Sequence, residues 1–266
     1  MNAVVSLMKY KSLLVTPIRK MAGHNKWSNI KHIKAAKDSK KAAISMKIMQ
    51  KMRLAIKEGG SHKPELNSRL ARLVDEARSN NIPMSSVENV LKSAEKNKNQ
   101  GTHLFVEGKG PGGCMMIVEV FSDNPRRTRQ ELSAAFRKSG GAIGDSGTAS
   151  HAYNYKGIVN ILKEGCSLNA DEATELAIEC EAEDVSETVD DNGREVWQFI
   201  TERKDVHKVK SELEKRSYKS TEARFAYIPE LFVELDEPVL AAAISLCNYA
   251  DQMSDVIRVY DNIKIQ

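Results

Sequence analysis

Apolar residues recur every three or four positions in the first third of the chain, a spacing that predicts amphipathic helices. In residues 39–57 one apolar face repeats at intervals of four, through Ile44, Ile48, Met52 and Ile56. Gly59 and Gly60 are expected to end this helix, because glycine readily takes the left-handed backbone at a helix C-terminus. A second helix is predicted over 66–77. It stops ahead of Pro83, since the residue before a proline disfavours helical backbone.

A third helix is predicted around Ser85. Ser85 and Glu88 have the spacing of a capping box, in which two side chains satisfy free amides at the start of a helix. Its apolar face consists of Val87, Val90, Leu91 and Ala94. Three short amphipathic helices favour a small bundle.

The period of the pattern changes after the polar segment 97–102, where a domain boundary is expected. Segments 104–107 and 115–121 predict strands, joined by the glycine-rich segment 108–113. A phosphate-binding loop would need Gly-Lys-Ser/Thr and a following helix, and this segment has neither. The glycines therefore predict a tight hairpin turn.

Asn124 and Pro125 are the residue types preferred at the cap and at the first position of a helix. Arg126 and Arg127 fall in its first turn, where each cation opposes the helix dipole at a cost of about 0.3–1 kcal/mol. A bound phosphate would offset that cost, which makes both arginines candidate phosphate ligands. The alternative is that both are simply solvated.

The segment 157–227 predicts elements in the order β-α-β-β-α-β, which is the ferredoxin-like arrangement. These elements are a strand at 158–162, a helix at 171–181, strands at 184–189 and 195–200, a helix at 204–215 and a strand at 220–227. A last helix at 237–249 and a strand at 255–260 have no partners of their own. We expect them to complete the sheet that begins at Leu104.

The predicted fold class is therefore α+β. It combines an N-terminal three-helix domain, a central α/β domain completed by the C-terminus and an inserted ferredoxin-like βαββαβ domain. The expected divisions are 1–21 as a presequence, 22–100 as the basic helical domain with its arm, 101–156 with 228–266 as the central domain, and 157–227 as the insertion.

The net charge of +4 conceals an uneven distribution. Residues 1–100 carry 21 basic and 7 acidic side chains, whereas residues 101–266 carry 19 basic and 29 acidic ones. A basic N-terminal part and an acidic remainder predict a polyanionic partner for the N-terminal part alone. The alternative is that lysine-rich helices are only well solvated.

The basic stretch 23–60 holds ten Lys or Arg residues and two acidic residues. The predicted nucleic-acid-binding residues in it are His24, Lys26, Trp27, Lys31, His32, Lys34, Lys37, Lys40 and Lys41. Stacking of Trp27 on an unpaired base would contribute about 1–3 kcal/mol; the alternative is that it anchors the arm in the core. If roughly five of the lysines neutralise phosphates, the log-log dependence of affinity on salt has a slope of about 3.5–4.5.

The first twenty residues contain four basic residues, no acidic residue and several hydroxyl side chains. This composition predicts a mitochondrial presequence, and a disordered cytosolic tail is the alternative. No run approaches 18 apolar residues, so no membrane-spanning helix is expected.

Enzyme and metal signatures are missing from the sequence. The four cysteines are far apart and form no CxxC, and the six histidines form no HExxH. There is no GxSxG. We therefore expect no catalytic residues, no metal and no cofactor.

Four segments of the chain resemble the YebC-like family: 21–38, 107–113, the helix after Asp123 and Asn124, and 255–263. The opening Gly-His-Asn-Lys-Trp at Gly23 is specific to it. Bacterial members begin at a methionine that matches Met21, so residues 1–20 form an extension similar to that of the mitochondrial members, which are translational activators of cytochrome c oxidase subunit I. The resemblance implies three domains, the third inserted in the second. The chain departs from the usual pattern at Arg127, because an asparagine more often follows the first arginine.

Charge and resemblance together predict a non-enzymatic translation factor of the mitochondrial matrix. It would bind mitochondrial messenger RNA or ribosomal RNA at the mitochondrial ribosome and support synthesis of proteins such as cytochrome c oxidase subunit I. A DNA-binding transcriptional regulator is the alternative, with DNA the less favoured partner. A scaffold that binds only proteins is a third possibility.

Overall fold

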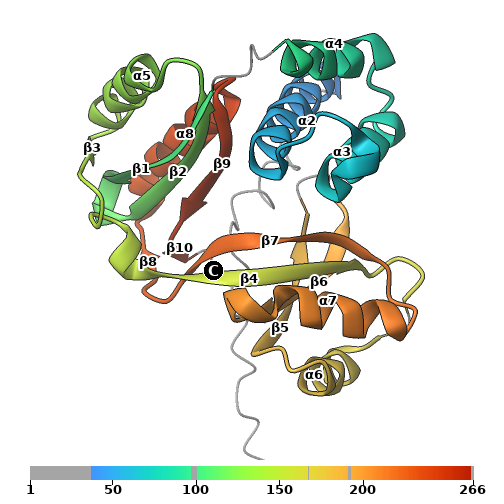
Figure 1. Cartoon of the computed structure of the whole chain (residues 1–266). Coiled ribbons are helices and arrows are strands. Elements are labelled where there is room, and N and C mark those ends of the chain that lie inside the picture. The colour runs from blue at the N-terminus through green and yellow to red at the C-terminus, as the bar shows by residue number, and fades with distance from the viewer. Residues whose placement is uncertain (1–36, 97–100, 167, 191–192, 265–266) are drawn as a thin grey trace, which may run out of the picture.

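The chain folds into a helical bundle and two four-stranded antiparallel sheets, each sheet covered by helices (Figure 1). The computed structural model describes residues 37–96, 101–166, 168–190 and 193–264. The mixture of helices and sheets confirms the predicted α+β class.

Three helices form the bundle: α2 (Lys37–Gly59), α3 (Ser68–Ser79) and α4 (Met84–Glu95), with the short 3-10 helix η1 (Pro64–Leu66) between the first two. They pack through the apolar faces that the sequence predicts, with Ile48, Met52, Leu70, Val74 and Val87 buried between them. Gly60 follows α2 with φ of 65°, so the helix ends in left-handed backbone as predicted.

The predicted capping box of the third helix is wrong. The N-cap of α4 is Pro83 and no side chain caps this helix. Because α4 already begins at Met84, Ser85 lies inside the first turn. An N-cap residue needs non-helical backbone, so Ser85 cannot take that role.

The first sheet has the strand order β3-β1-β2-β9. Its strands are β1 (Thr102–Lys109), β2 (Met115–Ser122), β3 (Ala142–Ile143) and β9 (Val256–Asp261). The predicted hairpin joins β1 to β2 through the 3-10 turn η2 (Pro111–Gly113), in which Gly112 has φ of 64°. Antiparallel pairing of β9 with β2, with Val118 opposite Val259, confirms that the C-terminus completes this sheet.

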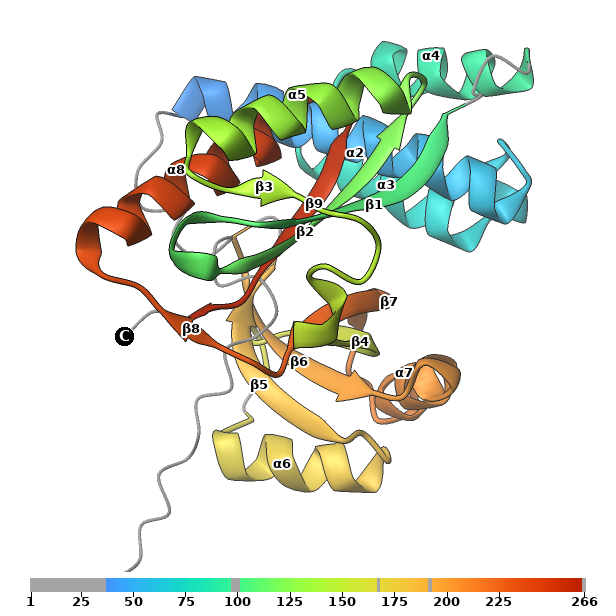
Figure 2. The ribbon, with the colours of Figure 1, turned by 90° about the vertical axis from the view of Figure 1, so that its left-hand side faces the viewer.

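Helices α5 (Pro125–Lys138) and α8 (Glu237–Gln252) cover one face of the first sheet (Figure 2). Leu132, Phe136 and Leu246 from these helices are buried against alternate residues of the strands, such as Val118 and Val259. Residues of opposite parity, including Glu119 and Arg258, therefore lie on the other face of the sheet.

The second sheet has the order β5-β6-β4-β7, the strand order of a ferredoxin-like unit. Its elements are β4 (Tyr153–Leu162), α6 (Ala170–Glu179), β5 (Asp184–Val189), β6 (Glu195–Thr201), α7 (Val206–Lys215) and β7 (Ser220–Pro229). The 3-10 helices η3 (Ser150–Ala152) and η4 (Arg203–Asp205) precede β4 and α7, and β8 (Val233–Glu234) pairs with β10 (Ile263–Lys264). The predicted divisions at 156/157 and 227/228 fall inside β4 and β7. The domain limits stay a prediction.

The two sheets and the bundle converge near β9. The ring centroids of Phe105 and Tyr227 are 5.3 Å apart, and those of Tyr227 and Tyr260 are 5.6 Å apart, which joins the two sheets by aromatic contacts. The bundle packs on the first sheet through Leu54, Phe121 and Ile257. The polar groups buried at this junction therefore belong to all three parts of the chain.

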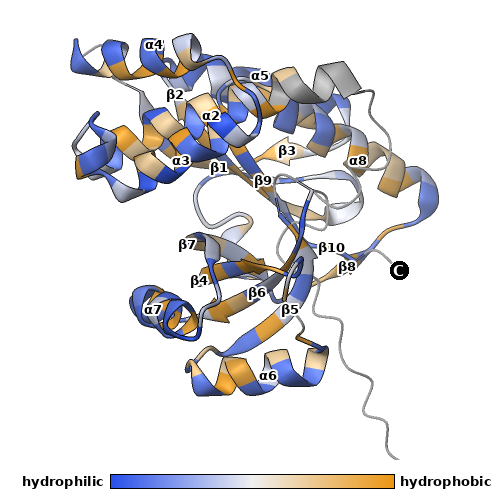
Figure 3. Ribbon diagram, turned by 90° about the vertical axis from the view of Figure 1, so that its right-hand side faces the viewer, coloured by the Kyte–Doolittle hydropathy of each residue, from blue (hydrophilic) through white to orange (hydrophobic). Residues whose placement is uncertain are grey.

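Hydrophobic and hydrophilic positions alternate along the helices (Figure 3), as expected of amphipathic helices that pack by one face. Within the described ranges, no helix combines the length and the hydrophobicity needed to cross a membrane.

Replacement of Phe136 by alanine should destabilise the central part of the protein. Phe136 is fully buried between α5 and the first sheet, and loss of a buried phenylalanine costs about 3–5 kcal/mol. Urea unfolding would show a lower midpoint for Phe136→Ala than for Arg137→Ala, an exposed neighbour on α5. Equal midpoints would contradict this account of the core.

Candidate nucleic-acid interface

Most of the predicted contacts of the basic arm lie outside the described residues. This applies to His24, Lys26, Trp27, Lys31, His32 and Lys34. The backbone of Lys37, Lys40 and Lys41 belongs to the beginning of α2, so these three positions are part of the bundle. The binding roles of all nine residues stay predictions.

The start of α5 has the predicted local structure. The Asn124 side chain accepts a hydrogen bond of 3.1 Å from the amide of Arg127, and Pro125 occupies the first helical position. Arg126 is exposed and makes no hydrogen bond or ion pair with any described residue. The guanidinium of Arg127 lies 3.3 Å from Asp255 and 3.6 Å from Glu131. The two predicted arginines therefore differ: Arg127 is paired with acidic side chains, whereas Arg126 has no partner among the described residues. The phosphate-binding roles of both stay predictions.

Asp255 explains how α5 tolerates arginines in its first turn. Its carboxylate accepts hydrogen bonds from the hydroxyls of Thr128 at 2.6 Å and Ser122 at 2.8 Å. Burial raises the pKa of Asp255, but hydrogen bonds from Thr128, Ser122, Ser254 and Arg127 outweigh that effect and lower the pKa. The ionised carboxylate beside the helix N-terminus supplies the negative charge that the dipole favours.

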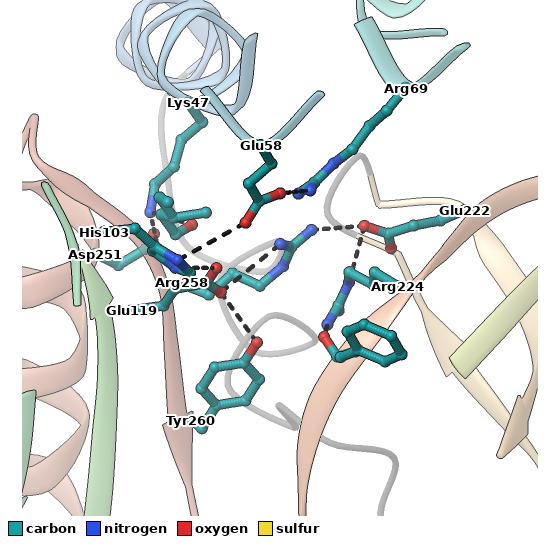
Figure 4. A network of polar contacts seen from close by, with 12 residues as sticks. Lys47, Glu58, Arg69, His103, Glu119, Glu222, Arg224, Asp251, Arg258 and Tyr260 are labelled. Atoms are coloured by element: carbon teal, nitrogen blue, oxygen red, sulfur yellow. Dashed lines mark hydrogen bonds and ion pairs between the residues drawn. The ribbon is translucent and has the colours of Figure 1, made fainter. Parts of the chain in front are cut away.

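A network of charged side chains links the bundle to both sheets (Figure 4). His103 on β1 lies between Glu119 on β2, at 3.1 Å, and Glu58 on α2, at 3.8 Å. Arg258 on β9 lies 4.0 Å from Glu119 and 2.6 Å from Glu222 on β7. The network therefore runs from α2 through the first sheet to the second sheet.

Glu119 is the buried acid at the centre of this network. Burial raises its pKa, but the hydrogen bond from His103 and the positive charges of Arg258, His103 and Arg224 prevail and lower the pKa to about 2. The Tyr260 hydroxyl donates to the same carboxylate at 3.1 Å. Glu119 is therefore an ionised acceptor at neutral pH.

A basic pocket lies between the bundle and the second sheet, and we call it the junction pocket. Its cations are Lys51 on α2, Arg69 and Arg72 on α3, Arg194 ahead of β6, Arg224 on β7 and Arg258 on β9. Its acidic residues are Glu76, Asp190 and Glu222, and the remaining lining residues are Leu73, Thr221 and Ala223. Among the described lining residues the cations outnumber the acids by six to three, so this part of the lining carries an excess of positive charge.

Neither the network nor the junction pocket is apparent from the sequence. The cations of the pocket span positions 51 to 258 and come from five segments that only the fold brings together. No local spacing signals such a cluster. Only the concentration of basic residues before residue 100 pointed toward the α3 side of the pocket.

In the described part of the chain, no group of three or more His, Cys, Asp or Glu side chains is placed to hold a metal ion. Cys114, Cys180 and Cys247 are buried as free thiols, and Cys166 is partly buried. Burial raises the pKa of Cys114 to about 12, which keeps this thiol protonated.

Comparison with protein families finds two matching family models. One is described as the TACO1/YebC protein N-terminal domain and matches residues 25–97; the other is described as the TACO1/YebC second and third domain and matches residues 102–263.

The individual relatives match nearly the whole chain, but they carry different functional names. Over 267 residues the chain is 36% identical to the rat (Rattus norvegicus) protein "Translational activator of cytochrome c oxidase 1", covering 99% of this chain and 88% of the relative. It is 34% identical to a "Probable transcriptional regulatory protein" of Thermotoga maritima, covering 92% of this chain and 94% of the relative. A crystal structure of a conserved hypothetical protein from Aquifex aeolicus matches with a TM-score of 0.73 and 29% identity, over 88% of this chain and 94% of that one.

Glu119→Gln should alter how stability depends on pH. The folded-state pKa of about 2 lies below the ordinary value of 4.5, so the stabilisation by Glu119 is complete above pH 4.5 and is lost as pH falls toward 2. The difference corresponds to about 3 kcal/mol at most. Urea unfolding should show a large penalty for Glu119→Gln at pH 7 that shrinks between pH 5 and pH 3.

Glu175→Gln, an exposed carboxylate on α6, is the control for this experiment. A penalty for Glu119→Gln that stays constant over the same pH range would show that the charge of Glu119 does not stabilise the network.

Proposed function

This chain belongs to the TACO1/YebC family, and we propose that it is a mitochondrial translation factor that binds RNA. In this proposal it acts in the matrix on mitochondrial messenger RNA or ribosomal RNA in contact with the mitochondrial ribosome. It would support synthesis of proteins such as cytochrome c oxidase subunit I without catalysing a reaction. The observation that carries the proposal is the similarity to the rat translational activator over 99% of the chain.

The charge distribution supports a nucleic-acid partner. Residues 1–100 carry 21 basic and 7 acidic side chains, a surplus suited to a phosphate backbone. Arg126 adds an available guanidinium on α5, and the junction pocket adds further cations at the face of α3. The acidic helix α6 carries Asp171, Glu172, Glu175 and Glu179 and would be kept away from RNA by repulsion.

The second candidate is a DNA-binding transcriptional regulator. It is favoured by the bacterial relatives, which are named probable transcriptional regulatory proteins. The same lysines would contact either backbone, because phosphate contacts position a protein without reading the sequence. The extension of residues 1–20, with its basic, acid-free composition, favours the mitochondrial RNA reading.

Crosslinking in whole cells, followed by sequencing of the recovered nucleic acid, separates the two candidates. We expect mitochondrial messenger RNA or ribosomal RNA to be recovered, and protein lacking residues 1–20 to lose this recovery because it no longer reaches the organelle. Recovery of promoter DNA alone would overturn the proposal in favour of transcriptional regulation.

The combined substitution Lys34→Glu, Lys37→Glu and Lys40→Glu should abolish RNA binding by the arm. Wild-type affinity should fall with salt concentration with a log-log slope of about 3.5–4.5. Any residual binding by the triple variant should have a smaller slope, because roughly three phosphate contacts are lost. The matched control is Lys138→Glu, Lys204→Glu and Lys219→Glu, three exposed lysines of the acidic part of the chain. Equal loss in both variants would mean that net charge, and not the arm, determines binding.

A further inference from the structure

The junction pocket is built from all three parts of the fold. Helix α3 of the bundle provides one wall, β7 of the second sheet provides the opposite wall, and Arg258 of the first sheet closes the inner end. Figure 1 shows α3 directly above β7, and Figure 4 shows Arg69, Glu222, Arg224 and Arg258 around the space between them. A ligand bound here would therefore contact the bundle and both sheets.

The inner end of the pocket holds two arginines that share one acid. Glu222 lies 2.8 Å from Arg224 and 2.6 Å from Arg258. The side chains of these arginines are only 8% and 5% exposed. Glu58 and Glu119 lie outside the lining but pair with Arg69 and Arg258, so the six described cations face five acids. Because positive charge in a partly buried site is costly unless anions balance it, the remaining positive charge favours a bound anion.

An arginine at the mouth of the pocket has no partner in the described chain. Arg72 is exposed on α3 and makes no hydrogen bond or ion pair with any described residue. Its neighbours are engaged: Arg69 pairs with Glu58, and Arg194 lies 2.7 Å from Asp190. The guanidinium of Arg72 is therefore available at the mouth of a positively charged pocket.

We propose that the junction pocket binds a phosphate group, that the RNA backbone is its source and that Arg72 is its principal ligand. Guanidinium groups present paired N–H donors that match phosphate oxygens, and Thr221 adds a hydroxyl to the lining. The assignment of the RNA backbone rests on the proposed function.

The lining favours a phosphate within a strand over a free nucleotide. Leu73 and Ala223 are its apolar residues, and among the described residues no aromatic side chain lines the pocket to stack on a base. The mouth is open, since Arg72 is exposed and the Arg69 side chain is 44% exposed. A strand can therefore pass across the mouth and place one phosphate inside.

The test measures binding of the full chain to a single-stranded oligouridylate of about 20 nucleotides over a range of salt concentrations. Arg72→Gln should weaken binding about tenfold at low salt and reduce the log-log slope by about 0.7. Arg72→Lys should restore the slope, because the charge returns, while recovering only part of the affinity. Arg78→Gln is the matched control: it lies on α3, pairs with Asp75 and does not line the pocket, so binding should stay as in the wild type.

A second measurement distinguishes the source of the phosphate. Inorganic pyrophosphate is added to wild-type protein and to Arg72→Gln, and the melting temperature is recorded. Stabilisation of the wild type alone, with an unchanged oligouridylate slope in Arg72→Gln, overturns the RNA backbone as the source and assigns a free phosphate compound instead. An unchanged slope without pyrophosphate stabilisation overturns the phosphate site.

Failure of the wild type to bind oligouridylate at all would count against the proposed RNA-binding function. The pyrophosphate measurement would then decide on the pocket by itself. Because Arg72 has no partner within the described chain, its replacement should leave the melting temperature without ligand unchanged, so lost binding cannot be attributed to unfolding.

Discussion

The ion pairs that run from Glu119 through Arg258 to Glu222 are the interaction on which the arrangement of the molecule depends. Glu119 and Arg258 are 7% and 4% exposed, and removing one partner of a buried pair typically costs about 3–5 kcal/mol. The three residues stand on β2, β9 and β7, so their contacts hold the second sheet against the first. His103 extends the network to Glu58 of the bundle. Apolar contacts such as Phe105 with Tyr227 also join these parts, but apolar attraction is largely non-directional, whereas the charged contacts specify one orientation.

Ion pairs between different elements also determine which arginines at the surface stay unpaired. At the start of α5, Arg127 is engaged by Asp255 while Arg126 stays exposed. On α3, Arg69 is engaged by Glu58 while Arg72 stays exposed. In both places a carboxylate from a different element orients one arginine and leaves its neighbour open. The paired carboxylate neutralises the engaged arginine, so in each place the positive charge open to an anion is that of the exposed arginine.

The sequence correctly predicted features that depend on contacts between residues close together in the chain. Asn124 caps α5 as expected because its side chain reaches an amide three residues away, and the glycine-rich hairpin forms because Gly112 takes positive φ. The predicted cap at Ser85 is wrong because the N-cap of α4 is Pro83, two residues earlier, which places Ser85 inside the first turn. The two-residue strands β3, β8 and β10 carry no periodic pattern of their own and exist only through their partners. The junction pocket could not be predicted for the same reason: Arg72 and Arg258 are close only after the bundle, the inserted sheet and the C-terminal strand have come together.

The proposed interface thus combines two kinds of positive charge with different physical roles. The lysines of residues 23–41 lie in a chain segment rich in charge and poor in apolar residues, and lysine is a compact charge on a flexible stem. Such charges attract a phosphate backbone from many directions and contribute affinity that salt weakens strongly. In the junction pocket, Arg69, Arg194 and Arg258 are held by Glu58, Asp190 and Glu222, and Arg72 stays open beside them on α3, so a phosphate would bind only in a defined place. An RNA that engages both would be drawn in by the lysines and oriented by the arginines. Because the pocket exists only when all three parts are assembled, its occupation would also favour the assembled form of the protein.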